Sequence, residues 1–264
     1  MAILSVTKQN LTYFTAEGIA VPHCFTTRLG GVSQGYLGSL NLGANRGDSM
    51  ENVEKNYKIL ANALPFSPQN AVLTRQTHSD IVRVVSKQDH RGFAHMDYPE
   101  CDGLVTNDPG TALVVFTADC TPILLYDPHT GAVGAVHAGW RGTASQIGAK
   151  AVKAMVEHFG AKPEHIRAAI GPNIGQCCFE TDADVPKAML DAYGIGAQAY
   201  ISRQGGKYYV NLKALNALSL QRLGVRQVEI SQECTACSGN LFWSHRVTGD
   251  RRGSQGAVIV CKEG

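Results

Sequence analysis

The sequence has few charges and few aromatic side chains. Charged residues make up 17% of its 264 residues and aromatic residues 7%, whereas globular domains usually carry roughly 25% charged residues. Because 44% of the residues are hydrophobic, this composition excludes an intrinsically disordered chain. The formal net charge is only +2, so the chain as a whole lacks the basic surface expected of a nucleic-acid-binding protein.

Long hydrophobic runs are missing as well. No stretch reaches the ~18 apolar residues that a membrane-spanning helix needs, and residues 1–5 show no basic segment leading into an apolar one. We therefore expect no secretory signal, no membrane association and a cytoplasmic protein. The sequence contains no repeat, low-complexity segment or clear linker, which predicts a single domain over residues 1–264.

The spacing of hydrophobic residues predicts alternating strands and helices. We expect Asp48 to cap the first helix and Thr143 to precede the second. Apolar residues recur every three or four positions in four segments, which predicts helices over residues 49–63, 144–159, 185–193 and 211–223. Short β-branched or apolar runs predict strands over residues 81–86, 112–116, 122–126, 132–137, 166–170, 207–210, 227–230 and 257–261.

A turn sequence joins two of these strands. The segment DPHTG at residues 127–131 separates strands 122–126 and 132–137 and predicts a β-hairpin between them. A hairpin requires antiparallel pairing, which favours a mixed sheet over a doubly wound parallel one. The expected fold class is therefore α/β, with mixed sheets flanked by helices.

Three potential metal ligands lie close to predicted strand ends. Cys120 lies in the segment TADCTP, His137 in VHAGWRGT and His78 in RQTHS. If these strand ends share one rim of the sheet, the side chains converge, and three ligands with an open fourth position are typical of catalytic zinc, which activates water near neutral pH. A nucleophilic Cys/His pair and three unrelated residues remain alternatives, because the spacings match no short metal motif.

Two further segments are candidates for binding a polar ligand. The predicted helix start after Thr143, with Arg141 beside it, suits an anion such as phosphate. Residues 23–48 are rich in glycine, asparagine and arginine and suit a ligand that accepts hydrogen bonds. An ordinary strand-to-helix turn and a surface loop are the respective alternatives.

Eight cysteines favour reduced thiols, a metal site or a catalytic thiol over a disulfide framework in a chain of this kind. Cys234 and Cys237 have the spacing of half a structural zinc site or of a redox pair, but no second such pair accompanies them, and we interpret them as incidental thiols. The adjacent Cys177 and Cys178 are expected to be structural. The remaining histidines are expected to be solvated; they are His90, His95, His129, His158 and His165.

Taken together, the motifs resemble the YfiH/DUF152 family of laccase-domain proteins over nearly the whole chain. The resemblance implies a zinc site made by His78, Cys120 and His137, and a single-domain mixed α/β fold similar to that of bacterial toxin cysteine hydrolases of the CNF1 type. The sequence departs from the family at Val247, where a second basic residue is usual. The motifs are residues 23–48, 75–79, 102–109, 117–122, 136–143, 170–180 and 233–246.

The resemblance also implies purine nucleoside chemistry, namely phosphorolysis of adenosine, inosine, guanosine and methylthioadenosine, and deamination of adenosine. The small-molecule partners would be a nucleoside and phosphate. Asn41 and Arg46 resemble pocket-lining positions of the family. We expect Arg46, Arg141 and the helix start to hold the phosphate, and Asp119 to be an acid–base candidate because it adjoins Cys120.

Other members of the family are described as copper-dependent polyphenol oxidases or as peptidoglycan editing factors. Copper is therefore an alternative to zinc, since imidazole and thiolate both accept it. The H-x-H pairs usual in multicopper laccases do not occur in this sequence. Hydrolysis of a cell-wall precursor and a non-enzymatic metal-binding role are the remaining alternatives.

Overall fold

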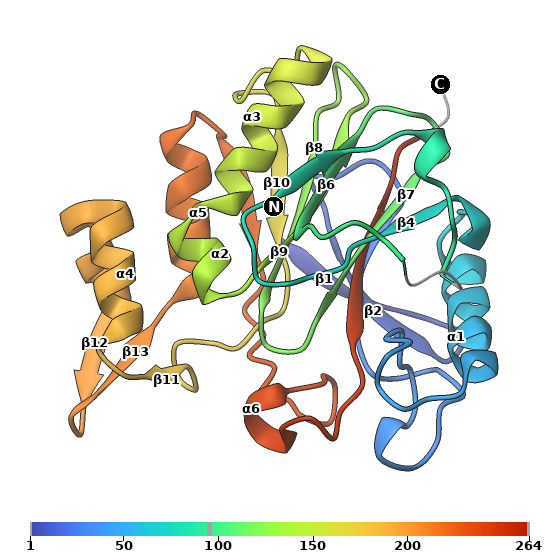
Figure 1. The fold of residues 1–264 in the computed structure, drawn as a ribbon, viewed down its shortest axis with the longest axis horizontal. Coiled ribbons are helices and arrows are strands. Elements are labelled where there is room, and N and C mark those ends of the chain that lie inside the picture. The colour runs from blue at the N-terminus through green and yellow to red at the C-terminus, as the bar shows by residue number, and fades with distance from the viewer. Residues whose placement is uncertain (1, 94–96, 263–264) are drawn as a thin grey trace.

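The computed structural model describes residues 2–93 and 97–262, which form three β-sheets with helices around them (Figure 1). The first sheet has the order β1 (Ile3–Lys8), β2 (Leu11–Ala16), β3 (His23–Thr26), β15 (Gln255–Val260), β7 (Ala112–Thr117), β4 (Ala71–Leu73). The second has the order β14 (Gln227–Ile230), β10 (Arg167–Ile170), β8 (Thr121–Tyr126), β9 (Val133–Ala138), β6 (Gly103–Thr106), β5 (Val82–Val84). The small third sheet has the order β11 (Glu180–Thr181), β13 (Lys207–Val210), β12 (Ile201–Gln204).

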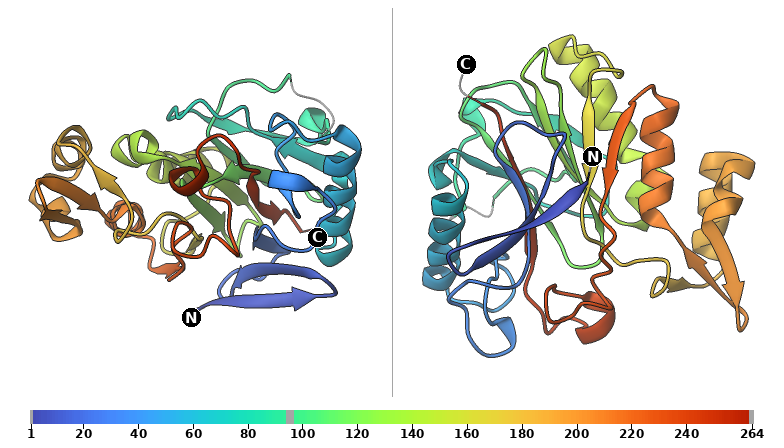
Figure 2. Two further views of the ribbon diagram at one scale, coloured as in Figure 1. Left: turned by 90° about the horizontal axis from the view of Figure 1, so that it is seen from below. Right: turned by 180° about the vertical axis from the view of Figure 1, so that it is seen from behind.

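The helices lie outside these sheets. They are α1 (Met50–Ala63), α2 (Trp140–Ala144), α3 (Ile147–Phe159), α4 (Asp184–Tyr193), α5 (Leu212–Arg222) and α6 (His245–Thr248), with 3₁₀ turns at Gly35–Leu37, Pro68–Asn70, Lys87–Asp89 and Gly194–Tyr200. Figure 2 shows α1 at one end of the molecule and α4 with the third sheet at the other. None of the helices in the described ranges is long and apolar enough to cross a membrane.

The mixed α/β architecture predicted from the sequence is confirmed. Strands β8 and β9 form the expected antiparallel hairpin, with Ile123 opposite Val136. Parallel pairs join β4 to β7, β5 to β6 and β10 to β14, while the other pairs are antiparallel. All eight predicted strands and three of the four predicted helices are present within a few residues of the expected bounds.

The second sheet is buried on both faces. Along β8, Leu124 packs into the core that includes Val114 and Val258 of the first sheet. Its neighbours Ile123 and Leu125 pack on the other face, where α3 and α5 cover the sheet. Because strand residues alternate between faces, this near-continuous apolar run belongs to a strand enclosed on both sides.

The predicted helix over residues 144–159 is wrong at its start. The chain forms α2 from Trp140, with Gly139 at its N-cap, and then breaks at Gln146, whose φ of 56° is left-handed. Thr143 lies buried within α2, where Tyr193 Oη donates to its carbonyl oxygen and Asn216 Nδ2 to its Oγ1. The helical spacing of apolar residues continues across Gln146, so it does not indicate the break between α2 and α3. The helix start expected after Thr143 is therefore not formed.

Two smaller predictions are corrected. Ser49, not Asp48, caps α1 by accepting from Asn52 N, while the Asp48 carboxylate accepts hydrogen bonds from Ser33 and Asn41. Solvation of the histidines holds for His129 and His158, which are exposed. His165 is half-buried and stacks on His129, and His90 is half-buried against Thr111; His95 lies outside the described residues.

Candidate metal centre and its cleft

The structure brings His78, Cys120 and His137 together. Cys120 Sγ lies 3.8 Å from His78 Nε2, and one ligand atom from each of the three residues lies within 4.8 Å of the others. The two imidazole rings are 5.0 Å apart and nearly perpendicular, at 86°. Tetrahedral zinc with bonds of ~2.0 Å to nitrogen and ~2.3 Å to sulfur separates these ligand atoms by about 3.6 Å. The donor set and its spacing therefore fit a zinc ion.

Local backbone structure creates this convergence. His78 lies in the turn between β4 and β5 with a left-handed φ of 59°, Cys120 immediately precedes β8, and His137 lies near the end of β9. Pairing of β8 with β9 sets Pro122 opposite His137. At Gly139 a Cβ would lie 2.8 Å from His78 Cδ2 and 3.3 Å from Cys120 Sγ, so this position needs glycine for space rather than for a special φ.

Asp102 holds two of the three ligands and was missed by sequence reasoning. Its buried carboxylate accepts the Nδ1 hydrogen bond of His137 at 2.7 Å. It also accepts from the backbone nitrogens of Thr77, His78 and Ser79, and from Ser79 Oγ at 2.6 Å. A carboxylate that accepts from Nδ1 leaves Nε2 of His137 free for a metal, a pattern typical of metal-binding histidines. Asp102 directly precedes β6, and β6 pairs with β9, the strand that carries His137. This pairing is the feature that could have indicated that Asp102 lies beside His137.

Charge stabilises the deprotonated thiol. Burial alone raises the pKa of Cys120, but the charge of His137 and hydrogen bonds from His137 and His78 outweigh burial and lower it to about 6. Burial lowers the pKa of His137, but Cys120 and Asp102 raise it to about 9. The Asp102 pKa falls to about 2, because hydrogen bonds from His137 and Ser79 outweigh its burial. The site therefore supplies a thiolate at neutral pH, the form of cysteine that binds metals.

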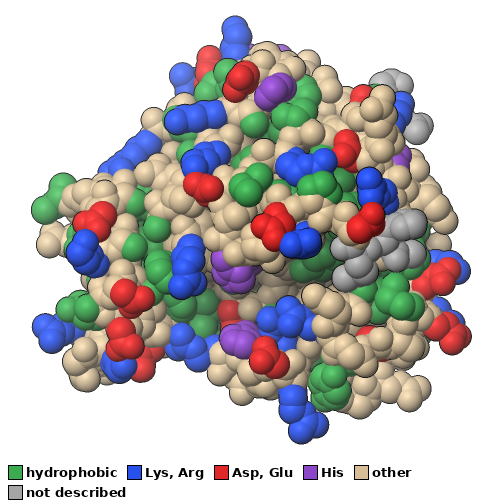
Figure 3. All heavy atoms as spheres, in the orientation of Figure 1, with side chains coloured by type: hydrophobic (Ala, Val, Ile, Leu, Met, Phe, Trp, Pro, Cys, Tyr) green, Lys and Arg blue, Asp and Glu red, His purple; other side chains and the backbone are tan. Residues whose placement is uncertain are grey.

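A cleft carrying three arginines opens over these ligands. Arg46, Arg246 and Arg252 line it together with the three ligand side chains. Burial, and then the nearby charge of Arg46, lower the pKa of Arg252 to about 10. Within the described ranges, neither Arg46 nor Arg252 forms an ion pair with a carboxylate. In Figure 3 this face is hollowed near its centre, where histidine and basic side chains border the depression. The cleft therefore suits an anion.

The other predicted site residues have different positions. Asp119 borders the cleft, but its carboxylate accepts from Thr235 Oγ1 at 2.5 Å and from Arg246 N at 2.7 Å. Asn41 is fully buried, and its side chain bonds backbone atoms of Gly43 and Ser254, which places it behind the cleft wall. Arg141 is exposed and stacks on Trp140; it is not among the residues that line the cleft.

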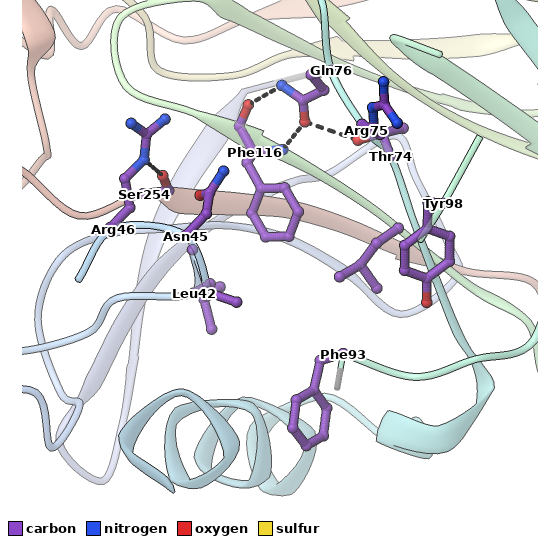
Figure 4. A pocket seen from close by; sticks show the side chains of 13 residues that line it. Leu42, Asn45, Arg46, Thr74, Arg75, Gln76, Phe93, Tyr98, Phe116 and Ser254 are labelled. Carbon is purple, nitrogen blue, oxygen red and sulfur yellow. Dashed lines mark hydrogen bonds between the residues drawn. The ribbon is translucent and has the colours of Figure 1, made fainter. Parts of the chain in front are cut away.

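A second pocket adjoins the cleft. Arg46, Gln76, Phe116 and Ser254 line both. In Figure 4 the Phe116 ring points into the pocket between Leu42 and Tyr98. The Gln76 amide is held by Phe116, accepting from its N at 2.7 Å and donating to its O at 2.8 Å. The pocket therefore offers flat apolar surfaces next to a cationic cleft.

Comparison with known proteins identifies the family. Residues 22–262 match the family described as multi-copper polyphenol oxidoreductase laccase. A purine nucleoside phosphorylase of Deinococcus radiodurans is 39% identical over 254 residues, covering 96% of this chain and 94% of that protein. The purine nucleoside phosphorylase YlmD of Bacillus subtilis is 36% identical over 246 residues, covering 90% of this chain and 88% of that protein. The purine nucleoside phosphorylase YfiH of Escherichia coli is 34% identical over 87% of this chain and 89% of its own.

This chain belongs to the YfiH family. The crystal structure of YlmD from Geobacillus stearothermophilus superimposes with a TM-score of 0.92 at 33% identity, covering all of both chains. That of YfiH from Bacillus licheniformis superimposes with a TM-score of 0.91, also at 33% identity, over 97% of each chain. The mixed α/β fold of the YfiH family, which the sequence resemblance implies, is therefore confirmed.

The C-terminal motif of this chain differs from the pattern expected for the family at Val247. Val247 is 58% exposed and does not line the cleft. Arg252, which sequence reasoning missed, and His245 line it instead. Arg252 follows α6 in an irregular segment, where no periodicity indicates which way a side chain points.

Proposed function

We propose that this chain is a purine nucleoside phosphorylase that uses zinc held by His78, Cys120 and His137. The observation that carries the proposal is the adjacency of a metal-ligand set, an arginine-lined cleft and an aromatic pocket. The arginines suit the phosphate, the aromatic pocket suits the purine, and the metal would lie beside the phosphate. The names of the relatives support the same reaction class.

In phosphorolysis an oxygen of inorganic phosphate bonds to C1′ of the ribose while the bond from C1′ to purine N9 breaks. The base leaves with the electron pair of that bond and takes up a proton, and ribose 1-phosphate forms. Arg46 and Arg252 are suited to hold the phosphate, because both line the cleft without forming an ion pair with a carboxylate in the described part of the chain. Orienting phosphate against C1′ removes much of the entropic barrier to the bimolecular step.

The pocket beside the cleft is suited to the purine. The Phe116 ring and Leu42 offer apolar surfaces against which a flat base can stack. The side chain of Gln76 is already bonded to the backbone of Phe116, so it fixes that ring's segment rather than reading the base. This arrangement favours tolerance among purines over strict selection, and we therefore propose adenosine, inosine, guanosine and methylthioadenosine as substrates.

Zinc at this site would act as a Lewis acid toward an oxygen of phosphate or water. The chain's own contribution is to hold Cys120 as a thiolate and to orient His137 through Asp102. Access of water to the same site is the basis for proposing adenosine deamination as a second reaction. Asp119 acts as a positioning residue in this account, because its carboxylate is bonded to Thr235 and Arg246.

Product analysis tests the proposal. Zinc-loaded protein is incubated with inosine or adenosine, with and without phosphate, and the products are separated by chromatography. We expect hypoxanthine and ribose 1-phosphate from inosine only when phosphate is present, and inosine from adenosine in both conditions. Absence of purine products, together with phenol oxidation that rises with copper loading, would replace the proposal by an oxidase. Release of an amino acid from a muramyl precursor would instead support cell-wall editing.

A further inference from the structure

Two pairs of cysteines that are far apart in the sequence meet on the surface. Cys177 and Cys178 follow β10, while Cys234 and Cys237 follow β14. Their four sulfur atoms all lie within 4.8 Å of one another. From the sequence no second pair was expected beside Cys234 and Cys237, and the structure places one there. The second pair is Cys177 and Cys178, which are adjacent and therefore do not form a C-x-x-C motif. Parallel pairing of β10 with β14 brings the two pairs together.

The spacing of the sulfur atoms matches a tetrahedral metal site. Cys237 Sγ lies 3.7 Å from Cys177 Sγ and 3.4 Å from Cys178 Sγ. Four thiolates around zinc at ~2.3 Å lie about 3.8 Å apart. A disulfide needs sulfur atoms ~2.0 Å apart, and all four thiols are free in the structure.

We propose that Cys177, Cys178, Cys234 and Cys237 form a second metal site, which binds zinc through four thiolates. Such a site has no open position, so it is structural rather than catalytic. It is separate from the His78, Cys120 and His137 set and shares no residue with it.

The surroundings suit a negatively charged thiolate cluster. Gly175 N donates to Cys234 Sγ at 3.1 Å, a hydrogen bond of the kind that supports metal-bound thiolates. A Cβ at Gly175 would lie 3.1 Å from Cys177 Sγ, so glycine leaves room for the sulfurs. The buried ammonium of Lys213 lies in the same depression as Cys177 and Cys234 and donates to Ser231 O at 2.8 Å.

Zinc at these cysteines would join two walls of the catalytic cleft. The segment before Cys177 contributes Ile174, and the segment after Cys237 leads to Arg246; both residues line the cleft. The two segments are already linked, since Arg246 Nη1 donates to Cys178 O at 2.8 Å. Thr235, between Cys234 and Cys237, donates to Asp119, the neighbour of Cys120. We therefore expect the second zinc to stabilise the cleft without contacting substrate.

The test is the number of zinc ions per chain, measured by elemental analysis on protein purified with zinc and freed of loosely bound metal. We expect two per wild-type chain, one in Cys237→Ser, one in Cys120→Ala, and none in the double variant. Ala236→Ser is the matched control, because it adds the same hydroxyl within the same turn and leaves every thiol in place. It should retain two.

One zinc per wild-type chain that Cys237→Ser leaves unchanged would overturn the proposal. Disulfides within the cluster, detected by intact mass under non-reducing conditions, would also overturn it. Replacement of zinc by cobalt distinguishes the loss of a ligand from a folding defect in Cys237→Ser. Wild type should show thiolate-to-cobalt charge-transfer absorption that falls by more than half in Cys237→Ser and in Cys177→Ser, with circular dichroism unchanged. Because both readouts count metal, failure of the nucleoside reaction would not affect them.

Discussion

The two ligand clusters of this chain differ in donor type and in access. The first combines two imidazoles with one thiolate at the floor of a cleft lined by arginines. The second consists of four thiols at the junction of two loops. Three ligands leave a coordination position for chemistry, whereas four thiolates close the shell. The number of ligands and the residues around them, rather than the presence of cysteine, therefore separate a catalytic from a structural role.

Loss of a ligand from the first cluster should have the largest effect on turnover. Cys120→Ala removes the only sulfur ligand there, so we expect nucleoside turnover to fall below detection while the fold persists. Steady-state assays with inosine and phosphate, together with circular dichroism, check this prediction. Full activity in Cys120→Ala would contradict a metal-centred reaction at this site.

Removal of the charge behind the first cluster should have the next largest effect. Asp102→Asn keeps the size of the side chain but weakens the hydrogen bond from His137 Nδ1 and the binding of the His78 turn. We expect a 10- to 100-fold loss of zinc affinity or of turnover. Zinc titration with a competing chelator measures it. Unchanged affinity would mean that Asp102 only supports the fold.

The cleft arginines should act on phosphate rather than on the metal. Arg252→Ala should raise the KM for phosphate roughly tenfold, about the loss of one charge-assisted contact, and leave the zinc content at two. Arg251→Ala is the matched control, because Arg251 is exposed and lies over Tyr36. Equal KM changes in the two variants would remove Arg252 from the phosphate site.

Disruption of the second cluster should have the smallest effect on catalysis. We expect Cys237→Ser to lower the melting temperature by several degrees, about what ~1–2 kcal/mol gives in a domain of this size, while zinc-loaded protein retains turnover within about threefold of wild type at 25 °C. Differential scanning calorimetry and the inosine assay give the two values. A loss of turnover as large as that of Cys120→Ala would make the two clusters functionally alike and break the comparison.

Sequence reasoning predicted the features that local patterns determine. Short β-branched or apolar runs predicted the strands, the turn at residues 127–131 predicted the β8–β9 hairpin, and the family resemblance predicted the first cluster. It failed where tertiary contacts determine the structure. The break at Gln146 depends on how α2 packs against Tyr193 and Asn216.

The missed site residues have the same physical origin. Asp102 and Arg252 lie beside residues distant in sequence, His137 and Arg46 respectively, and neither belongs to a motif of metal ligands. The second cluster joins an adjacent cysteine pair to a C-x-x-C pair, and only the pairing of β10 with β14 brings them together. Arg141 lies in the same motif as His137 and was expected to hold phosphate, whereas in the structure its side chain stacks on Trp140 and is not among the residues that line the cleft.

The most direct test of the account measures purine release from inosine against phosphate concentration in wild type, Cys120→Ala and Cys237→Ser, each assayed after zinc loading. The account predicts saturable, phosphate-dependent hypoxanthine release in wild type and Cys237→Ser, and none in Cys120→Ala. Hypoxanthine release that is independent of phosphate, or that persists in Cys120→Ala, would contradict it.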